Sequence, residues 1–336
     1  MSGQVPVVIL NWNGTADTLA CLRSIRAADT AGFVPVVVDN GSNREALEQL
    51  RQGCREIYPN LLTVASHELA QPAAQRRARL AGLAEGGLLL VESPENLGFA
   101  RGSNLGVPLA EALDSPWLML LNNDTVVRPD TFAVLRRCAA AHPEFTALTA
   151  QIQDFEPGTR IQNCGGDLTY FGSRRYHYAG ADAAAAPKRE CSVVTFVTGC
   201  ALLYNFRDVG ALSEDFFFGE EDYEFSLRLQ RLGRRMACVH GAVVHHKFAT
   251  SITKAARPLG FVVANYATRL VNVRNYYSPA RWHATRLLAY LYLPLLLARR
   301  GIAPSRSFAA VRMIEAHLRR HRGVGRTEFQ ALLAAE

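Results

Sequence analysis

The chain has 336 residues, 49% of them hydrophobic, and a formal net charge of +7. This length and apolar content exclude a disordered or collagen-like chain and suffice for one large core or two modest ones. The seven cysteines are scattered without a Cys-x-x-Cys pair, which favours reduced thiols over a disulfide framework or a zinc site. The first apolar run is too short for a secretory signal, so we expect a cytoplasmic protein.

The first elements of the chain form a strand–helix–strand unit. Two β-branched runs, VPVVIL (5–10) and VPVVVDN (34–40), flank residues 15–28, where apolar residues recur at helical spacing. This order is typical of a parallel βαβ unit. A second helix is predicted for residues 44–57 and a strand for 88–93, and the polar, alanine-rich stretch 60–86 between them is interpreted as a helical or loop-like insertion.

The α/β alternation continues through the middle of the chain. We predict a helix for about residues 102–113, a central strand in the apolar run 117–127 and a helix over 129–141. Mixed strand and loop segments follow up to residue 204, and another helix begins near Glu220. The predicted fold class is therefore α/β, with a mostly parallel central sheet flanked by helices.

Polar segments follow four of the predicted strands. They are NWNG (11–14), DNGS (39–42), NLGFARGSN (96–104) and NNDT (122–125). Each is an ordinary turn signal when taken alone. If the strands are parallel neighbours, however, all four segments meet at the sheet edge where ligands bind. Neither Gly-x-Gly-x-x-Gly nor Gly-x-x-x-x-Gly-Lys is present, which disfavours a dinucleotide site and a P-loop.

These four segments, followed by TGCALL (198–203) and FFGEEDYEFSLRLQRLG (217–233), resemble the inverting family 2 glycosyltransferases, especially their rhamnosyltransferase-like members. The resemblance implies a Rossmann-like domain of the GT-A type over residues 1–250. It implies transfer of a sugar from a nucleotide diphosphate donor, of the dTDP-rhamnose or UDP-hexose class, to a saccharide or lipid-linked acceptor hydroxyl in cell-surface polysaccharide synthesis. Nucleic acid is not among the expected partners.

The resemblance also assigns the donor and metal sites. Asp39 offers a carboxylate to the ribose or base, and Arg101 supplies part of the positive charge for the diphosphate. Without a phosphate-binding loop, a divalent cation, Mg²⁺ or Mn²⁺, must neutralise the rest. Family members use an Asp-x-Asp element for this cation, and here Asp124 is the remaining acid, unless it merely ends a strand. The predicted donor-binding residues are Asn11, Asn13, Asp39, Asn40, Gly98, Arg101, Asn104, Asn122 and Asn123.

The acidic start of the predicted helix near residue 220 holds the candidate base. Displacement at the anomeric carbon requires a carboxylate that takes the acceptor proton. The resemblance matches Asp222 to this base and Glu221 to a residue that orients the acceptor, with Glu220 as the nearest competitor. Acids in a first helical turn also occur simply as dipole complements on a solvated surface, and this alternative stays open.

Two adjacent histidines, His245 and His246, follow a strand-like run. Neighbouring side chains of a strand point to opposite faces, so only one of the two can face the site. A histidine after such a strand is a metal ligand in some similar transferases, and their spacing matches His246 better than His245. The alternative is that His246 is structural.

Residues 251–336 are predicted to form a basic, helical extension. Twelve arginines lie between positions 269 and 326, against one acid, Glu315. The apolar run 287–298 contains Pro294 and is too short to span a bilayer, which needs about 20 residues. We expect it either at the anionic inner surface of the cytoplasmic membrane, as a peripheral contact, or buried against the main domain.

Two other functions compete with glycosyl transfer. A sugar nucleotidyltransferase also places a nucleotide on a parallel sheet, but it relies on a glycine-rich, lysine-containing N-terminal loop that this sequence lacks. A catalytically inactive saccharide-binding protein is the second alternative, because Asn122 replaces the first carboxylate of the metal element. Such a protein would release no nucleotide diphosphate from the donor.

Overall fold

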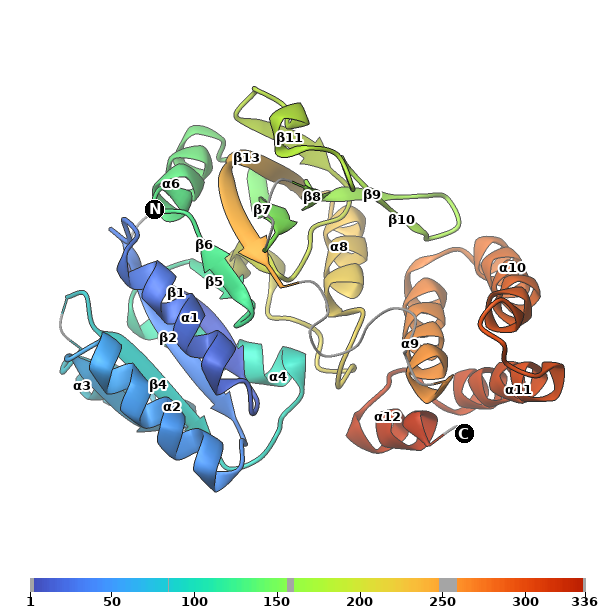
Figure 1. The fold of residues 1–336 in the computed structure, drawn as a ribbon, viewed down its shortest axis with the longest axis horizontal. Helices are drawn as coiled ribbons and strands as arrows, with labels where there is room; N and C mark the ends of the chain where they lie inside the picture. The colour runs from blue at the N-terminus through green and yellow to red at the C-terminus, as the bar shows by residue number, and fades with distance from the viewer. Residues whose placement is uncertain (1–2, 84, 156–159, 248–258, 335–336) are drawn as a thin grey trace.

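The computed structural model describes residues 3–83, 85–155, 160–247 and 259–334. One large sheet lies between helices, and a group of helices from the C-terminal region packs against α8 (Figure 1). The predicted α/β architecture is confirmed. The predicted boundary at residue 250 lies outside the described residues.

The N-terminal half of the sheet is parallel throughout. Its strand order is β3-β4-β2-β1-β5. Both faces of these strands are covered, which explains their continuous apolar runs. Residues alternate between the two faces, so that Val7 and Ile9 enter one core and Val8 the other. The bounds are β1 Val5–Asn11, β2 Phe33–Asn40, β3 Leu61–Ala65, β4 Leu88–Ser93 and β5 Trp117–Leu121.

The sheet continues beyond β5 with strands of both directions. β12 pairs antiparallel with β5 and β7, β13 runs parallel to β7, and β11 lies antiparallel to β13 at the edge. The end of β13 also pairs with β6, β8 pairs with β7, and β9 and β10 form a separate hairpin. The bounds are β6 Thr125–Val127, β7 Phe145–Asp154, β8 Ile161–Asn163, β9 Gly166–Leu168, β10 Arg174–Tyr176, β11 Cys191–Val194, β12 Ala201–Asn205 and β13 Arg235–His246.

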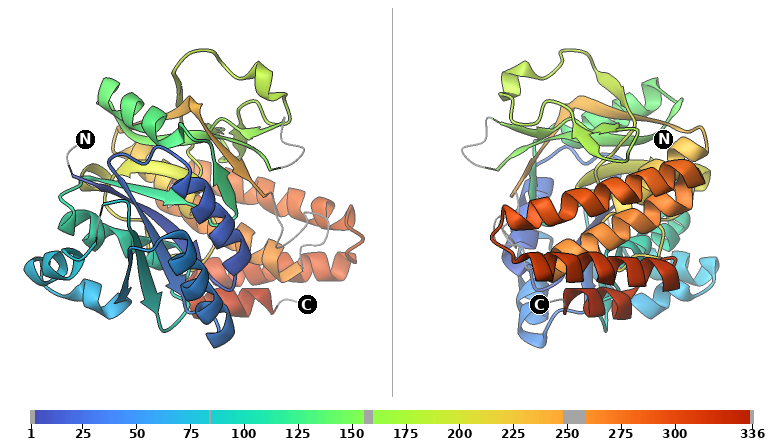
Figure 2. Two further views of the ribbon diagram at one scale, coloured as in Figure 1. Left: turned by 60° about the vertical axis from the view of Figure 1, so that its left-hand side comes forward. Right: turned by 90° about the vertical axis from the view of Figure 1, so that its right-hand side faces the viewer.

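Helices cover both faces of the sheet (Figures 1 and 2). α1, α2 and α6 contribute apolar residues to one core, and α5, α7 and α8 to the other. The bounds are α1 Thr15–Arg26, α2 Arg44–Ile57, η1 Ser66–Ala70, α3 Ala73–Leu80, α4 Phe99–Asn104, α5 Gly106–Ala112, α6 Thr131–Ala141, η2 Ala183–Ala185, α7 Phe206–Val209 and α8 Glu221–Arg231.

Three elements differ from the sequence prediction. The central strand predicted over 117–127 ends at Leu121, and after a turn residues 125–127 form the separate strand β6, which pairs with β13. Within the stretch 60–86, residues 61–65 form the edge strand β3, which pairs in parallel with β4 and was not predicted. The single helix predicted over 102–113 is two helices, α4 and α5, and begins at Phe99. Pro108 explains the break, since it has no N–H to bond the carbonyl of Asn104.

The C-terminal region is helical, as predicted. Its helices share a third core, to which the main domain contributes Phe196, Phe216, Tyr223 and Leu227. Figure 2 shows these helices gathered on one side of the molecule. Across the described residues, none of the helices has the length and apolar content needed to cross a membrane. The bounds are α9 Leu259–Tyr276, α10 Pro279–Ala298, α11 Pro304–Arg320 and α12 Arg326–Leu333.

Candidate active site

The four polar segments meet at one edge of the sheet, as predicted. β5, β1, β2 and β4 are consecutive parallel neighbours, and each segment follows the carboxyl end of one of them. Parallel strands place their carboxyl ends on the same side, which is where ligands bind in open α/β sheets. The topology therefore gathers residues that lie more than a hundred positions apart in the chain.

Asn11 organises the first two segments. Its buried amide donates to Asp39 Oδ1 at 2.9 Å and to Ser42 Oγ at 3.2 Å. Its side-chain oxygen, Oδ1, accepts from Thr18 Oγ1 at 2.9 Å and from the Gly14 N–H at 3.2 Å. Asp39 is itself buried, and its second oxygen accepts the Ser42 N–H at 3.2 Å. One amide thus fixes the turn after β1, the start of α1 and the carboxylate after β2.

The rim of this arrangement is formed by Asn13 and Asn43. Asn13 has a left-handed backbone with φ 54°, a conformation that asparagine tolerates better than most residues. Its side-chain oxygen accepts from the Asn43 N–H at 2.9 Å and from Asn43 Nδ2 at 3.0 Å. Asn43 in turn caps α2.

Asn40 holds the third segment against the second. Its amide nitrogen donates to Asn96 Oδ1 at 3.1 Å and to the Gly98 carbonyl at 3.2 Å, and its oxygen accepts the Leu97 N–H at 2.9 Å. Gly98 has φ 81°, and a β-carbon there would lie 2.3 Å from the carbonyl oxygen of Phe217. Only glycine permits this approach, which brings the loop before α8 onto the sheet edge.

Two further residues predicted to bind the donor, Arg101 and Asn104, contact a different loop. Asn104 donates to the Leu212 carbonyl at 2.9 Å and accepts the Leu212 N–H at the same distance. Arg101 is 3.6 Å from Glu214 as an ion pair, with 57% of its side chain exposed. α4 therefore directs both side chains toward residues 212–214.

The segment after β5 joins the Asn11 network through Asn123, whose amide donates to Thr18 Oγ1 at 3.1 Å. The Asn122 N–H donates to the Cys200 carbonyl at 2.9 Å. The Asn122 carbonyl accepts from Thr125 Oγ1 at 2.6 Å, which closes the turn between β5 and β6. The turn presents Asp124 next to the end of β13.

Asp124 faces His246, with 3.3 Å between Asp124 Oδ1 and His246 Nε2. Asp124 Oδ1 is buried and has no hydrogen-bond partner in the described part of the chain. His246 Nδ1 lies 2.9 Å from Gln162 Oε1, and Gln162 Nε2 donates to the His246 carbonyl at 2.8 Å. Nδ1–H therefore donates to Gln162, and in the neutral imidazole the Nε2 lone pair would face the carboxylate.

Two acceptors at this distance fit a cation between them. A buried carboxylate oxygen without a donor is costly, and a bound cation removes that cost. Carboxylate oxygen suits Mg²⁺ and Mn²⁺, whereas imidazole suits transition metals, so the pair favours Mn²⁺. Gln162 fixes the imidazole in the way that outer partners of metal ligands do. His245, by contrast, points its Nδ1 to the Asp154 carbonyl at 3.3 Å.

Asp222 lies in the first turn of α8 with a quarter of its side chain exposed. Its Oδ1 accepts from Arg174 at 3.1 Å and its Oδ2 from the Gly199 N–H at 3.4 Å. Burial raises the pKa of Asp222, and the charge of Arg174 opposes this rise. The carboxylate is held in place on two sides and remains partly open to a substrate.

The segment TGC connects the acid Asp222 to the Asn122 turn. The N–H of Gly199 contacts Asp222, and the carbonyl of the next residue, Cys200, accepts the Asn122 N–H. Cys200 is buried, which raises the pKa of its thiol, and the charges of Asp124 and Asp222 both add to the rise. Gly199 and Cys200 therefore link the candidate base, Asp222, to the turn that carries the candidate metal ligand, Asp124.

Glu220, the competitor for the base, is neutralised by two arginines. Arg174 and Arg269 each approach its carboxylate to 2.9 Å, and its side chain is only 6% exposed. Burial acts to raise the pKa of Glu220, but the two positive charges outweigh it and the net pKa is lowered. Its φ of 69° is strained for a residue with a side chain, and the ion pairs hold it there.

Comparison with known proteins decides the family. A family model described as "Glycosyltransferase like family 2" matches residues 3–260, which is most of the chain. The chain belongs to this family. No curated protein matches this glycosyltransferase significantly.

Two solved structures are similar to this glycosyltransferase. The mannosyltransferase PcManGT from Pyrobaculum calidifontis, in complex with GDP-Man and Mn²⁺, is 18% identical with a TM-score of 0.53, over 100% of this chain and 86% of that one. S. aureus TarS 1–349 is 11% identical with a TM-score of 0.50, over 99% of this chain and 90% of that one. At these identities the likeness concerns the fold, and it supports the predicted GT-A type.

Several site residues of this glycosyltransferase were missed from the sequence. Gln162, Arg174 and Arg269 lie outside every motif, on β8, β10 and α9, and meet the site only through folding. Gly199 lies within TGCALL, so the family motif contained a signal for it although no role was assigned.

Glu221 gives this glycosyltransferase a testable pH dependence of stability. Burial, reinforced by the charges of Asp222 and Glu220, raises the pKa of Glu221 from 4.5 to about 8. The folded state thus binds the Glu221 proton more tightly than the unfolded state. The contribution of this carboxyl group to folding stability is therefore complete below about pH 4.5 and is lost as the pH rises through about 8. Glu221→Gln mimics the protonated acid and can still accept the Gly219 N–H, which donates to Oε1 at 2.8 Å.

We expect the variant to gain several degrees in Tm over wild type at pH 9 and little at pH 5. Thermal unfolding across this range measures the effect, with the exposed Glu45→Gln as the matched control. Parallel Tm curves for wild type and Glu221→Gln would contradict the shifted pKa.

Proposed function

We propose that this glycosyltransferase moves a sugar from a nucleotide diphosphate donor to an acceptor hydroxyl with inversion, using Asp222 as base and a divalent cation at Asp124 and His246. The observation that carries the proposal is the unpartnered Asp124 Oδ1, 3.3 Å from His246 Nε2, beside the residues that contact Asp222. When bound, the cation would neutralise the diphosphate and stabilise it as the leaving group.

The remaining roles belong to the residues of the chain. Asp39 and the 11–14 turn hold the nucleoside, and Arg174 with the Gly199 N–H orients the Asp222 carboxylate. Asp222 accepts the acceptor hydroxyl proton, the acceptor oxygen bonds to the anomeric carbon, and the bond from that carbon to the diphosphate breaks. Glu221 orients the acceptor indirectly, because it is buried and fixes the loop before α8 through Gly219.

The donor class within this proposal is dTDP-rhamnose or a UDP-hexose, and the acceptor is a saccharide or lipid-linked saccharide of cell-surface polysaccharide. The solved mannosyltransferase holds GDP-Man and Mn²⁺, so GDP-mannose joins the candidates. A thermal-shift screen of these sugars with and without Mn²⁺ tests the proposal, since a ligand at 100 times its Kd stabilises by about 2.7 kcal/mol.

We expect one donor to raise Tm in the presence of Mn²⁺, and the same donor to yield a nucleotide diphosphate on incubation with saccharide acceptors. A protein that binds the donor and never releases the diphosphate is the inactive saccharide-binding alternative. Release of pyrophosphate from a nucleoside triphosphate and a sugar phosphate would identify a nucleotidyltransferase.

A second part of the proposal is association with an anionic membrane surface. α10 has an apolar face on each side. Trp282, Leu293 and Leu297 are buried in the third core, while Leu291 and Leu295 are 61% and 62% exposed. The other exposed apolar side chains of this surface, which we call the α10 face, are Leu287, Leu288 and Tyr292. One side of α10 is thus buried, as in the packing alternative, and the opposite side exposes the apolar residues of the proposed membrane contact.

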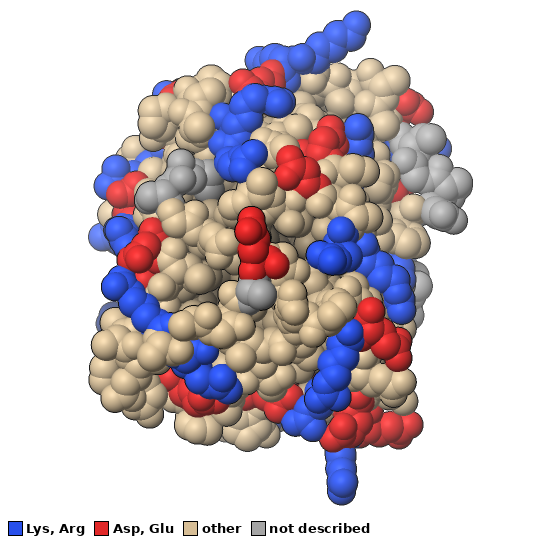
Figure 3. Space-filling view, turned by 90° about the vertical axis from the view of Figure 1, so that its left-hand side faces the viewer, with Lys and Arg blue, Asp and Glu red and all other residues tan. Residues whose placement is uncertain are grey.

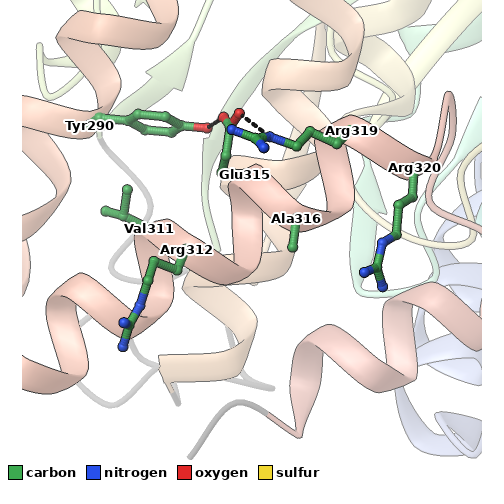
Figure 4. A pocket seen from close by; sticks show the side chains of 7 residues that line it. All are labelled: Tyr290, Val311, Arg312, Glu315, Ala316, Arg319 and Arg320. Atoms are coloured by element: carbon green, nitrogen blue, oxygen red, sulfur yellow. Dashed lines mark hydrogen bonds and ion pairs between the residues drawn. The ribbon is translucent and has the colours of Figure 1, made fainter.

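The charge around the α10 face is positive. Glu315, the one acid between residues 269 and 326, is already paired with Arg286 and Arg319. A pocket of about 400 Å³ between α10 and α11 is lined by Arg312, Arg319 and Arg320 and by one carboxylate, Glu315, so its charge is positive (Figure 4). On the side facing away from these helices, Lys/Arg and Asp/Glu side chains are interspersed (Figure 3). Basic residues near an anionic bilayer contribute about 1 kcal/mol each, and buried CH₂ groups about 0.8 kcal/mol.

We expect Leu291→Ser/Leu295→Ser to reduce binding to vesicles of anionic phospholipid at least tenfold at low salt. Val193→Ser, an exposed apolar residue on β11, is the matched control and should bind like wild type. Sedimentation at low and high salt measures the binding, which should weaken with salt. Equal sedimentation of both variants, or none of wild type at low salt, would remove the membrane proposal.

A further inference from the structure

Three side chains with metal-binding atoms lie together in the core, and none of them belongs to the candidate active site. Cys164 follows β8, and Cys238 and His240 lie on β13. All three are buried, and their ligand atoms lie within 4.8 Å of one another. Tetrahedral ligands about 2.0 to 2.3 Å from one Zn²⁺ lie about 3.3 to 3.8 Å apart. The three atoms would therefore have to draw together by at most about 1.5 Å to hold a single ion.

The orientation of His240 supports a ligand role. Its Nε2 lies 2.6 Å from Ser192 Oγ on the neighbouring strand β11. Its Nδ1 is buried and has no hydrogen-bond partner among the described residues. A buried ring nitrogen without a partner is costly. With Nε2–H donating to Ser192, Nδ1 presents a lone pair, which is the state that binds a metal, and Ser192 fixes the ring.

Gln151 supplies a fourth atom. Cys164 Sγ lies 3.6 Å from Gln151 Oε1, and Gln151, on β7, is only 2% exposed. Two thiolates, one neutral imidazole and one amide oxygen around Zn²⁺ have no net charge. A neutral site avoids the cost of burying a charge in the apolar core.

We propose that Cys164, Cys238 and His240 bind a structural Zn²⁺, with Gln151 as the fourth ligand. The site ties the segment after β8 to β13, upstream of His246 on the same strand. Sulfur and nitrogen ligands select zinc, whereas the carboxylate at Asp124 suits Mn²⁺ or Mg²⁺. The zinc proposal does not depend on the proposed catalytic cation.

A second group, Cys138, His142 and Cys191, is the competitor for a metal ion. It is less suited, because both ring nitrogens of His142 already face carboxylates, at 3.5 Å from Glu144 and 3.4 Å from Glu190. A metal ion bound to His142 would have to displace one of these carboxylate contacts. The two groups are distinguished by separate variants.

Elemental analysis of the full chain, purified under reducing conditions without added metal, tests the proposal. We expect about one Zn²⁺ per wild-type chain, retained in Cys191→Ser and in the remote buried-cysteine control Cys54→Ser. Cys164→Ser and Cys238→Ser should each lose most of the zinc and show a lower Tm. Wild type refolded with Co²⁺ instead should show a thiolate-to-cobalt absorption band, a readout that needs no variant.

Three results would overturn the proposal. The first is loss of zinc in Cys191→Ser together with its retention in Cys164→Ser, which would place the ion at Cys138, His142 and Cys191. The second is a wild-type chain that binds neither Zn²⁺ nor Co²⁺ after refolding with either ion. The last is thiol counting that finds Cys164 and Cys238 joined as a disulfide.

Discussion

Asp222→Asn should keep donor binding and lose about 10²- to 10⁴-fold in turnover, the usual effect of removing a general base. The Asp222 carboxylate is a quarter exposed and contacts one arginine, whereas Glu220 is buried between two, so Asp222 is the acid better placed to take a proton. Asparagine keeps the size of the side chain and can still accept from the Gly199 N–H. The loss should therefore appear in turnover and not in nucleotide affinity.

Initial rates of nucleotide diphosphate release, together with donor-induced Tm shifts, measure the two quantities separately. Glu45→Gln, an exposed acid on α2, is the control and should match wild type in both. If Asp222→Asn turns over within a few-fold of wild type, Asp222 is not the general base, and this role would be reassigned to Glu221 or Glu220. If donor binding is lost as well, the residue belongs to the donor site.

Asp124→Ala should abolish the Mn²⁺-dependent part of donor binding, and His246→Ala should weaken it less. Asp124 Oδ1 faces His246 Nε2 at 3.3 Å without a hydrogen bond, so in the proposed site each would supply one atom to the cation. Mutating a residue that merely orients a ligand typically costs about 10- to 100-fold in metal affinity. We expect that range for Gln162→Leu and a larger loss for Asp124→Ala.

Titration of Mn²⁺ in the presence of donor, followed by Tm, ranks these variants. His245→Ala is the matched control, because its imidazole contacts the Asp154 carbonyl and faces away from Asp124. His245→Ala should change at most the Tm of the protein without ligand and leave Mn²⁺-dependent donor binding as in wild type. Donor binding and activity that survive EDTA would show that this protein works without the cation.

The order of the motifs by itself determined the class of the fold and the edge that carries the site. Each polar segment follows an apolar, β-branched run, and parallel strands bring such segments to one side. NWNG, DNGS, NLGFARGSN and NNDT could therefore be placed together without coordinates. The pairing of β5, β1, β2 and β4 as parallel neighbours confirmed this placement.

Only the tertiary structure decided which side chains face one another at that edge. β13 shifts its register against β7 between Val239 and Val243, so strand alternation alone does not fix which histidine faces Asp124. Arg174 and Arg269 reach Glu220 from a hairpin and a helix without any motif. Cys164 and Cys238 are neighbours in space although they lie far apart in the chain. Turn and periodicity signals are local, whereas these contacts arise from pairing between distant segments.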